Sequence, residues 1–258
     1  MSIQPAPGPP THRPLEIEAA PFGDSALMLK ALAATSEERQ AGSRRLRELV
    51  FNLQPHGLLD VVAGVDSVLV EFDCLAVSHA QLTQTIRLAA AVSGPDLADA
   101  GRPAGLFVIP VVVSEAFSPD LPEVAAELGI SPEAVLDILG NSELSINLLA
   151  SAMAPMMGTL PFPGQVSRCR EPRTNVDPGS VMVAGTSAII QPFPGPSGWK
   201  VIGRTPLTVC DIREDPATSY TPGDRVRFRV IPESEWEALE GQFLRPAAAT
   251  GGTTDADR

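Results

Sequence analysis

The stretch from Asp177 to Asp211 constrains the fold of this chain most, because its apolar runs are short and each one is closed by Gly or Pro. Short runs rich in Val and Ile that end at such residues are typical of β-strands joined by tight turns. The turn sequence Asp177-Pro178-Gly179 precedes one of these runs, Ser180 to Val183. This part of the chain is therefore predicted to fold as a β-barrel or a β-sandwich.

The segment Arg225 to Val230 extends the same prediction toward the C-terminus. It reads RVRFRV, a strict alternation of basic and apolar residues. In a strand, this alternation places Val226, Phe228 and Val230 on a side that faces a core and the arginines on the other side. No helical period persists between Leu144 and Ile231, so the prediction covers the whole of this region.

The N-terminal half alternates strand and helix patterns. Two capping boxes, Thr35-Ser36-Glu37-Glu38 and Ser78-His79-Ala80-Gln81, each begin a helical period, because such a box satisfies two otherwise free backbone N–H groups. Strand patterns occur before, between and after these helices, at Asp24–Ala33, Leu58–Val65, Ser67–Phe72 and Leu106–Val113. The order β-α-β-β-α-β predicts a ferredoxin-like α+β domain, a four-stranded sheet covered by two helices.

The chain of 258 residues is long enough for two domains of ordinary size. The patterns predict an α+β domain over residues 17–114, a bridge of two short helices over 115–143, and a β-barrel domain over 144–233. Residues 1–16 are Pro-rich and are predicted to form a disordered tail, and residues 234–258 are predicted to hold a short helix followed by another tail.

Composition excludes several function classes. A formal net charge of −12 argues against a nucleic-acid partner, because neutralising phosphates requires a basic face. The N-terminus lacks the pattern of a signal peptide and no run of about 18 apolar residues occurs, so we expect a cytoplasmic protein without a membrane partner. The three cysteines are far apart and the histidines are isolated, so no metal site is predicted.

Arg204 and Arg173 are the first candidates for a ligand contact. Each lies in a segment braced by Gly or Pro, and a guanidinium group can hold a carboxylate or a phosphate through two parallel hydrogen bonds. The alternative is a structural role, in which each arginine binds carbonyl groups of loops. Trp199 is interpreted first as an aromatic residue of the core or its rim.

A series of short motifs resembles one protein family. In order they are Phe22-Gly23-Asp24-Ser25-Ala26, SVLVEFD at Ser67–Asp73, Ile109-Pro110-Val111, Pro119-Asp120-Leu121, Ser131-Pro132-Glu133, Pro172-Arg173, Pro178-Gly179-Ser180-Val181, Val183-Ala184-Gly185, Ser197-Gly198-Trp199 and Ile202–Pro206. Together they resemble the family of the B subunit of 5-oxoprolinase, which is also known as KipI-like and as allophanate hydrolase subunit 1. The resemblance covers most of the chain between residues 20 and 232.

The resemblance implies a fold, an activity and a partner. The fold is a small α+β domain followed by a cyclophilin-like β-barrel. The activity is the ATP-dependent opening of 5-oxoproline to glutamate by a hetero-oligomeric assembly that includes a KipA-like C subunit, with ATP and Mg²⁺ used at the level of the complex. Phosphorylation of the lactam oxygen would create a better electrophile for water.

The resemblance also implies residue roles. Arg173 and Arg204 would bind the substrate carboxylate or a transferred phosphate, and the pocket wall would include Gly179, Ser180, Trp199, Pro155 and Gly158.

The chain departs from the family pattern at two motifs. Where the family carries G-F-P-Y-L-G, this chain has Met153-Ala154-Pro155-Met156-Met157-Gly158, and where the family carries Q-T-G-I-Y-P it has Ser187-Ala188-Ile189-Ile190-Gln191-Pro192. These departures leave open an altered substrate or a scaffold without turnover. The alternative functions are a KipI-like regulator that inhibits a histidine kinase and a subunit of an allophanate or urea-pathway hydrolase.

Overall fold

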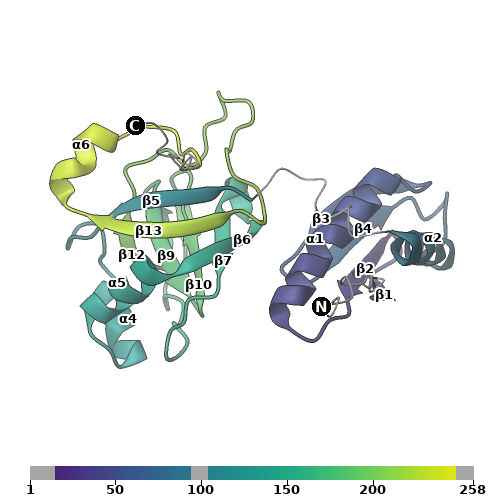
Figure 1. Ribbon diagram of the computed structural model, residues 1–258, viewed down its shortest axis with the longest axis horizontal. Coiled ribbons are helices and arrows are strands. Elements are labelled where there is room, and N and C mark those ends of the chain that lie inside the picture. Colours follow the sequence, from purple (N-terminus) through teal and green to yellow (C-terminus); the bar gives the residue numbers. More distant parts are fainter. Residues whose placement is uncertain (1–14, 94–103, 248–258) are drawn as a thin grey trace, which may run out of the picture. The chain divides into compact units, whose positions relative to one another are not determined.

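The computed structural model describes residues 15–93 and 104–247, and it divides the chain into two compact units, Met1–Pro103 and Ala104–Arg258 (Figure 1). Most of the two predicted tails lies outside the described residues.

Within residues 15–93, four antiparallel strands form a sheet in the order β1-β2-β4-β3. The elements are β1 (Ile17–Pro21), β2 (Ala26–Ala31), α1 (Ser36–Leu53), β3 (Leu58–Ala63), β4 (Val68–Phe72) and α2 (His79–Val92). Both predicted capping boxes are present, at Thr35 and at Ser78. The two helices bury one apolar stripe each, around Leu46 and Leu82, against the same sheet core.

The predicted strand order of a ferredoxin-like domain is wrong in this unit. The strand β5 (Leu106–Val112), which was expected to complete the N-terminal sheet, pairs instead with β12 and β13 of the second unit. The fourth strand of the N-terminal sheet is β1, which the pattern analysis did not identify. Its five residues include two alanines and a proline, so they lack the Val- and Ile-rich composition that predicts strands.

Within residues 104–247, seven strands close a barrel in the order β10-β7-β6-β13-β5-β12-β9, which confirms the predicted β-barrel. The elements of this unit, besides β5, are α4 (Leu121–Leu128), α5 (Pro132–Asn141), β6 (Glu143–Leu149), η1 (Ser151–Met153), β7 (Pro155–Gly158), β8 (Arg173–Val176), β9 (Ser180–Ala184), β10 (Ser187–Ile190), β11 (Gly195–Ser197), β12 (Lys200–Arg204), β13 (Arg225–Ile231), η2 (Glu233–Glu235) and α6 (Trp236–Leu239).

The two short helices α4 and α5 are part of the barrel unit and do not form the predicted bridge. They lie side by side against the barrel (Figure 1), and Val124 and Leu139 are fully buried in the same apolar cluster as Phe107 and Ile202 of the strands. Their apolar stripes are therefore buried by the barrel itself, which explains why the domain boundary falls near residue 104 and not at 114.

The alternation predicted for β13 holds over most of the strand. Val226 and Phe228 are buried, whereas Arg225 and Arg227 are exposed. The prediction is wrong for Val230, which is 45% exposed, because Ile231 takes the core position at the end of the strand.

A second, smaller apolar layer lies outside the barrel. The two-stranded sheet of β8 and β11 contributes Val176, which packs with Met182, Ile189 and Val201 of three barrel strands. The sequence neighbours of these residues, such as Val181 and Ile202, belong to the barrel interior. Both faces of these strands are therefore buried, as their continuous apolar runs require.

Candidate functional site

Arg173 forms an ion pair with the residue that precedes helix α4. Its Nη2 donates to Asp120 Oδ1 at 2.6 Å, and Asp120 Oδ2 accepts from the backbone N–H of Val201 at 2.7 Å. The hydrogen bond from Arg173 to Asp120 raises the pKa of the guanidinium further above its ordinary value. The pair joins β8, the start of α4 and β12, so the guanidinium is held by groups of the chain itself.

Arg204 is held by a carbonyl, a carboxylate and two aromatic rings. Its Nε donates to the carbonyl of Pro178 at 2.9 Å, and its Nη1 lies 3.4 Å from Asp177 Oδ2. The guanidinium carbon lies 5.6 Å from the ring centroid of Phe117 and 5.2 Å from that of Trp236, and these two rings stack on each other. The geometry matches the structural role that the sequence left as an alternative for this residue.

Gly179 and Ser180 lie in the same turn as the partners of Arg204. Gly179 has a φ of +81°, and a Cβ atom there would lie 2.3 Å from the carbonyl oxygen of Thr205, so only glycine fits. Its backbone donates to Gln191 and accepts from Thr205. Ser180 is buried at the beginning of β9. This turn joins three segments of the barrel and does not place the Ser180 side chain on the surface.

Pro155 and Gly158 begin and end β7, directly after a strained turn. Ala152 and Met153 in this turn adopt φ values of 57° and 65°, a left-handed conformation that side chains disfavour. The buried Tyr220 donates from its hydroxyl to the carbonyl of Met153 at 2.9 Å, which fixes the turn. Backbone strain of this kind is concentrated at functional sites, and the turn lies in the segment that departs from the family motif.

Asn147, on the strand that precedes this turn, supplies a buried polar group that lacks a partner among the described residues. It is 7% exposed, it lies at a β-bulge of β6, and its Oδ1 atom accepts no hydrogen bond from any described residue. A Cβ atom on Gly158 would lie 2.9 Å from Asn147 Nδ2 and 3.7 Å from Ser187 Oγ. Asn147, Gly158 and Ser187, from β6, β7 and β10, are called the Asn147 cluster below.

Trp199 precedes β12 and packs against the outer apolar layer near Met156. The carbonyl of Trp199 accepts a hydrogen bond from the thiol of Cys169 at 3.7 Å. The same sulfur lies 3.5 Å from Nη1 of Arg173. Trp199 is thus a rim aromatic residue of the barrel, as its first interpretation stated.

A buried ammonium group was not predicted at all. The side chain of Lys200 is 1% exposed, and its Nζ lies 2.6 Å from Glu127 Oε1 and 3.0 Å from Glu123 Oε1, both on α4. The hydrogen bond from Lys200 lowers the pKa of Glu127. Burial by itself would lower the pKa of Lys200, but its interactions with the two glutamates outweigh this desolvation, so the pKa of Lys200 is raised. Lys200 is therefore charged and cannot act as a base. An isolated lysine in a strand gives no sequence signal for such a network.

The structure thus separates the predicted site residues into groups. Arg173 lies with Asp120 and Trp199, Arg204 lies with Gly179 and Ser180, and Pro155 and Gly158 lie with the Asn147 cluster. Of these groups, the Asn147 cluster alone combines a buried polar atom without a described partner and a close approach to a glycine of the backbone. Asn147 itself could have been suspected from the sequence, because an amide in an apolar strand needs a partner.

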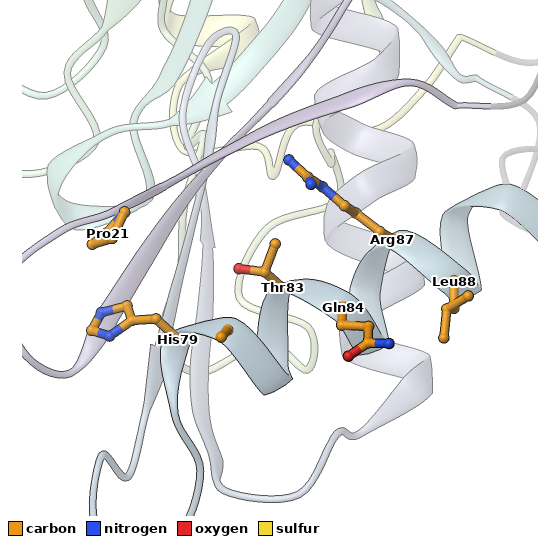
Figure 2. A pocket seen from close by; sticks show the side chains of 7 residues that line it. Pro21, His79, Thr83, Gln84, Arg87 and Leu88 are labelled. Carbon is orange, nitrogen blue, oxygen red and sulfur yellow. The ribbon is translucent and has the colours of Figure 1, made fainter.

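A groove of about 520 Å³ lies in the N-terminal unit, beside helix α2. Its lining includes Pro21, His79, Thr83, Gln84, Arg87 and Leu88. Figure 2 shows Thr83 and Arg87 projecting from the helix toward the strand that carries Pro21. His79 Nε2 lies 3.0 Å from the carbonyl of Ala26, so that ring nitrogen is already engaged.

No helix within residues 15–93 and 104–247 has the length and apolar character needed to cross a membrane. The same residues also contain no group of three or more His, Cys, Asp or Glu side chains that could hold a metal ion.

Comparisons with known proteins place this chain in a family. The family model described as carboxyltransferase domain, subdomain C and D, matches residues 17–220. The B subunit of 5-oxoprolinase from Bacillus subtilis (strain 168) is 37% identical over 133 residues, 51% of this chain and 55% of that protein. The B subunit of 5-oxoprolinase from Escherichia coli O157:H7 is 36% identical over 139 residues, 53% of this chain and 63% of that protein.

Solved structures agree with these matches. The crystal structure of TTHA0988 superposes with a TM-score of 0.65 at 28% identity and covers 84% of this chain and 40% of that chain. The chain matches less than two thirds of the length of the two 5-oxoprolinase relatives named above. Because the family model matches most of its residues, the chain belongs to the carboxyltransferase domain, subdomain C and D, family, in which it is similar to the B subunits of 5-oxoprolinase.

Proposed function

We propose that this protein is a subunit of an ATP-dependent hydrolase that opens a cyclic amide, with 5-oxoproline as the substrate and glutamate as the product. The observation that carries the proposal is the similarity to the B subunits of 5-oxoprolinase at 37% and 36% identity. A KipA-like C subunit is the proposed partner, because relatives that are named as one subunit of an enzyme act within an assembly. The cytoplasm is the proposed location, since ATP and this amino acid derivative occur there.

The donor groups of residues 15–93 and 104–247 do not fit Mg²⁺-ATP. The described residues contain no metal-ligand cluster, and the sequence has no phosphate-binding loop between a strand and a helix. We therefore assign the binding of ATP and Mg²⁺ to the other members of the proposed assembly. This chain would contribute groups that bind and orient the amide.

The Asn147 cluster is the proposed contact for the amide. The Oδ1 atom of Asn147 is an acceptor without a partner among the described residues, and a lactam N–H is a donor of matching chemistry. A buried acceptor that gains a partner only with substrate bound favours that substrate over an analogue without the N–H group. Pro155 and Gly158 would shape the rim of this site, whereas Arg173, Arg204, Gly179 and Ser180 would preserve the fold around it.

The test is 5-oxoproline-dependent ATP hydrolysis by this chain co-expressed with its KipA-like partner and the third subunit. We expect stimulation by 5-oxoproline, and a loss of about ten- to hundredfold in kcat/KM for Asn147→Ala, since one hydrogen bond in a site of low dielectric is lost. Asn175→Ala is the matched control, because Asn175 is an exposed asparagine of β8.

Two results would remove the proposal. An assembled wild-type complex that does not respond to 5-oxoproline would exclude the substrate. Equal activity of Asn147→Ala and Asn175→Ala in an active complex would exclude the role of the Asn147 cluster.

A second candidate function, inhibition of a histidine kinase by direct binding, is favoured by the groove beside α2. Strand β1 lies at the edge of its sheet. The residues that flank it pair toward β2, because Phe22 donates to the carbonyl of Ala26 and the carbonyl of Glu16 accepts from Leu32. The alternating N–H and C=O groups of Ile17 and Ala19 therefore point outward. An extended protein segment can add to such an edge. The test is whether the pure chain slows kinase autophosphorylation and whether Arg87→Glu in the groove abolishes this effect, with Lys30→Glu on β2 as the control.

A further inference from the structure

A cavity of about 660 Å³ lies on the outside of the barrel, between strands β5 and β13 and the C-terminal segment that follows α6. Its floor is apolar and includes Val108, Pro110, Leu207 and Phe243, and its lining also contains Arg229 and Arg245. We propose that this cavity, called the Arg229–Arg245 cavity, binds a small organic anion that consists of an apolar body and one carboxylate or phosphate group.

The walls of the Arg229–Arg245 cavity are fixed by backbone pairing. Strands β5 and β13 are parallel, with Arg229 opposite Pro110, so the arginine stands directly beside the apolar floor. The C-terminal segment is fastened on the other side, because Thr208 donates to the carbonyl of Gln242 at 2.9 Å and Leu244 donates to that of Thr208 at 2.9 Å. The cavity is therefore preformed, which reduces the entropic cost of binding.

The cationic groups of the cavity have few partners among the described residues. Earlier in β13, Arg225 and Arg227 both pair with Glu143, at 2.8 and 2.7 Å. Arg229 has a single ion pair at 3.8 Å within the described part of the chain, with Glu235. Arg245 forms no ion pair with any described residue, and its guanidinium carbon lies 5.4 Å from the ring centroid of Phe243.

The charge pattern favours an anion of small size. In a chain with a net charge of −12, two arginines that have one carboxylate contact between them, at 3.8 Å, form a local positive site that attracts an anionic ligand. Two guanidinium groups match the oxygens of one carboxylate or phosphate. The exposed side chain of Val108 and the ring of Phe243 give the rest of the ligand an apolar surface, and the volume lies within the range of small-molecule sites.

The test is calorimetric titration of the full chain with octanoate, octyl phosphate and the neutral 1-octanol. We expect saturable binding of at least one anion and none of 1-octanol. The double variant Arg229→Gln/Arg245→Gln should bind the anion about ten- to hundredfold more weakly, because charge-assisted hydrogen bonds are lost. Arg213→Gln is the matched control, since it removes a positive charge from an exposed loop and should leave the affinity unchanged.

The relative affinities of octanoate and octyl phosphate decide which headgroup the cavity prefers. The proposal is overturned if neither anion binds, if 1-octanol binds as well as the anions, or if the double variant binds like Arg213→Gln. Because the readout is binding by the isolated chain, these outcomes are independent of any hydrolase activity. Both arginines are exposed, so unfolding of the variants is not expected, and a thermal melt checks this directly.

Discussion

Arg204 stabilises the fold, although the sequence made it a candidate for a ligand contact. Its guanidinium stacks against Phe117 and Trp236 and closes the turn at Pro178 through the Nε donor. The planar, delocalised cation suits this environment because it can stack and donate in one plane at the same time. An ammonium group satisfies neither geometry equally well.

We therefore expect Arg204→Lys to lower the free energy of unfolding by about 1–3 kcal/mol, the sum of one hydrogen bond and the stacking contacts. The measurement is urea denaturation followed by tryptophan fluorescence. Arg213→Lys, at an arginine side chain that is 86% exposed, is the control and should change stability by less than about 0.5 kcal/mol. Equal stability of the two variants would contradict the structural role of Arg204.

The left-handed turn before β7 supports a second prediction for one residue. Ala152 has a φ of 57°, a left-handed conformation that glycine adopts at a lower energetic cost than alanine. We expect Ala152→Gly to raise the free energy of unfolding by about 0.5–1 kcal/mol, since relief of backbone strain exceeds the added entropy of the unfolded chain. Ala150→Gly is the control, because Ala150 has a φ of −80°, and it should destabilise the protein instead. Two variants that shift stability in the same direction would refute the explanation.

The sequence allowed part of the candidate site to be predicted. The glycine turn at Gly179 and the rim position of Trp199 follow from local residue types, and the structure agrees with both. The partner of Arg173 could not be predicted, since Asp120 lies far away in the chain and only the barrel brings the two together. Asn147 stands out in the sequence only as an amide within an apolar strand, and its missing partner is known from the structure alone.

Among the elements, helix α4 depends most on charges. It is attached to β12 by the buried ammonium of Lys200, whose partners Glu127 and Glu123 are 28% and 63% exposed. The lysine is thus buried, whereas its two glutamate partners are in contact with water. Removal of the lysine leaves carboxylates that reach water, whereas removal of the carboxylates leaves a charge without a partner in the interior.

We expect the double variant Glu123→Gln/Glu127→Gln to lose about 3–5 kcal/mol of unfolding free energy, because it leaves the buried ammonium unpaired. Lys200→Met conserves volume and should lose less than about 2 kcal/mol. Urea denaturation at neutral pH measures both values. The opposite ranking would show that the ammonium is solvated in the native protein.

The same ion pair predicts a dependence on pH. The pKa of Glu127 is lowered from its ordinary value of 4.5, chiefly by the hydrogen bond from Lys200. The stability that this lowering contributes is complete above about pH 5, and it is lost as the pH falls through the lowered pKa of the folded state. The difference in unfolding free energy between wild type and Lys200→Met should therefore shrink below pH 4.5, as measured by urea denaturation between about pH 7 and about pH 3. A constant difference over this range would exclude the linkage.

Elements with local signals were predicted well, and elements defined by remote contacts were not. The helices α1 and α2 begin at their predicted capping boxes, because the box is a contact between residues three positions apart. The helices α4 and α5 were also predicted, as two short helices over residues 115–143, but their place against the barrel was not. Periodicity shows that a helix buries a stripe and gives no information about the surface that buries it.

At the scale of the molecule, the barrel unit needs a strand that precedes its helices in the chain. Strand β5 lies between β13 and β12 in the barrel order and pairs with β13 along its whole length, from Leu106 to Val112. Its neighbour β13 is the last strand of the described residues, so two remote segments of the unit's sequence meet in one parallel pair. A boundary predicted from sequence order alone missed this pair, because a parallel partner far along the chain has no local signature.

This topology predicts which fragments fold. A fragment of residues 104–258 contains every strand of the barrel and should show a cooperative urea transition and elute as a folded monomer. A fragment of residues 115–258, cut at the boundary that the sequence predicted, lacks β5 and leaves β12 and β13 with unpaired edges, so we expect it to aggregate or to unfold without cooperativity. The matched control is a full chain with Val108→Thr, which keeps β5 and changes one exposed side chain. Circular dichroism and size-exclusion chromatography distinguish these cases, and a cooperatively folded 115–258 fragment would show that the barrel does not require closure by β5.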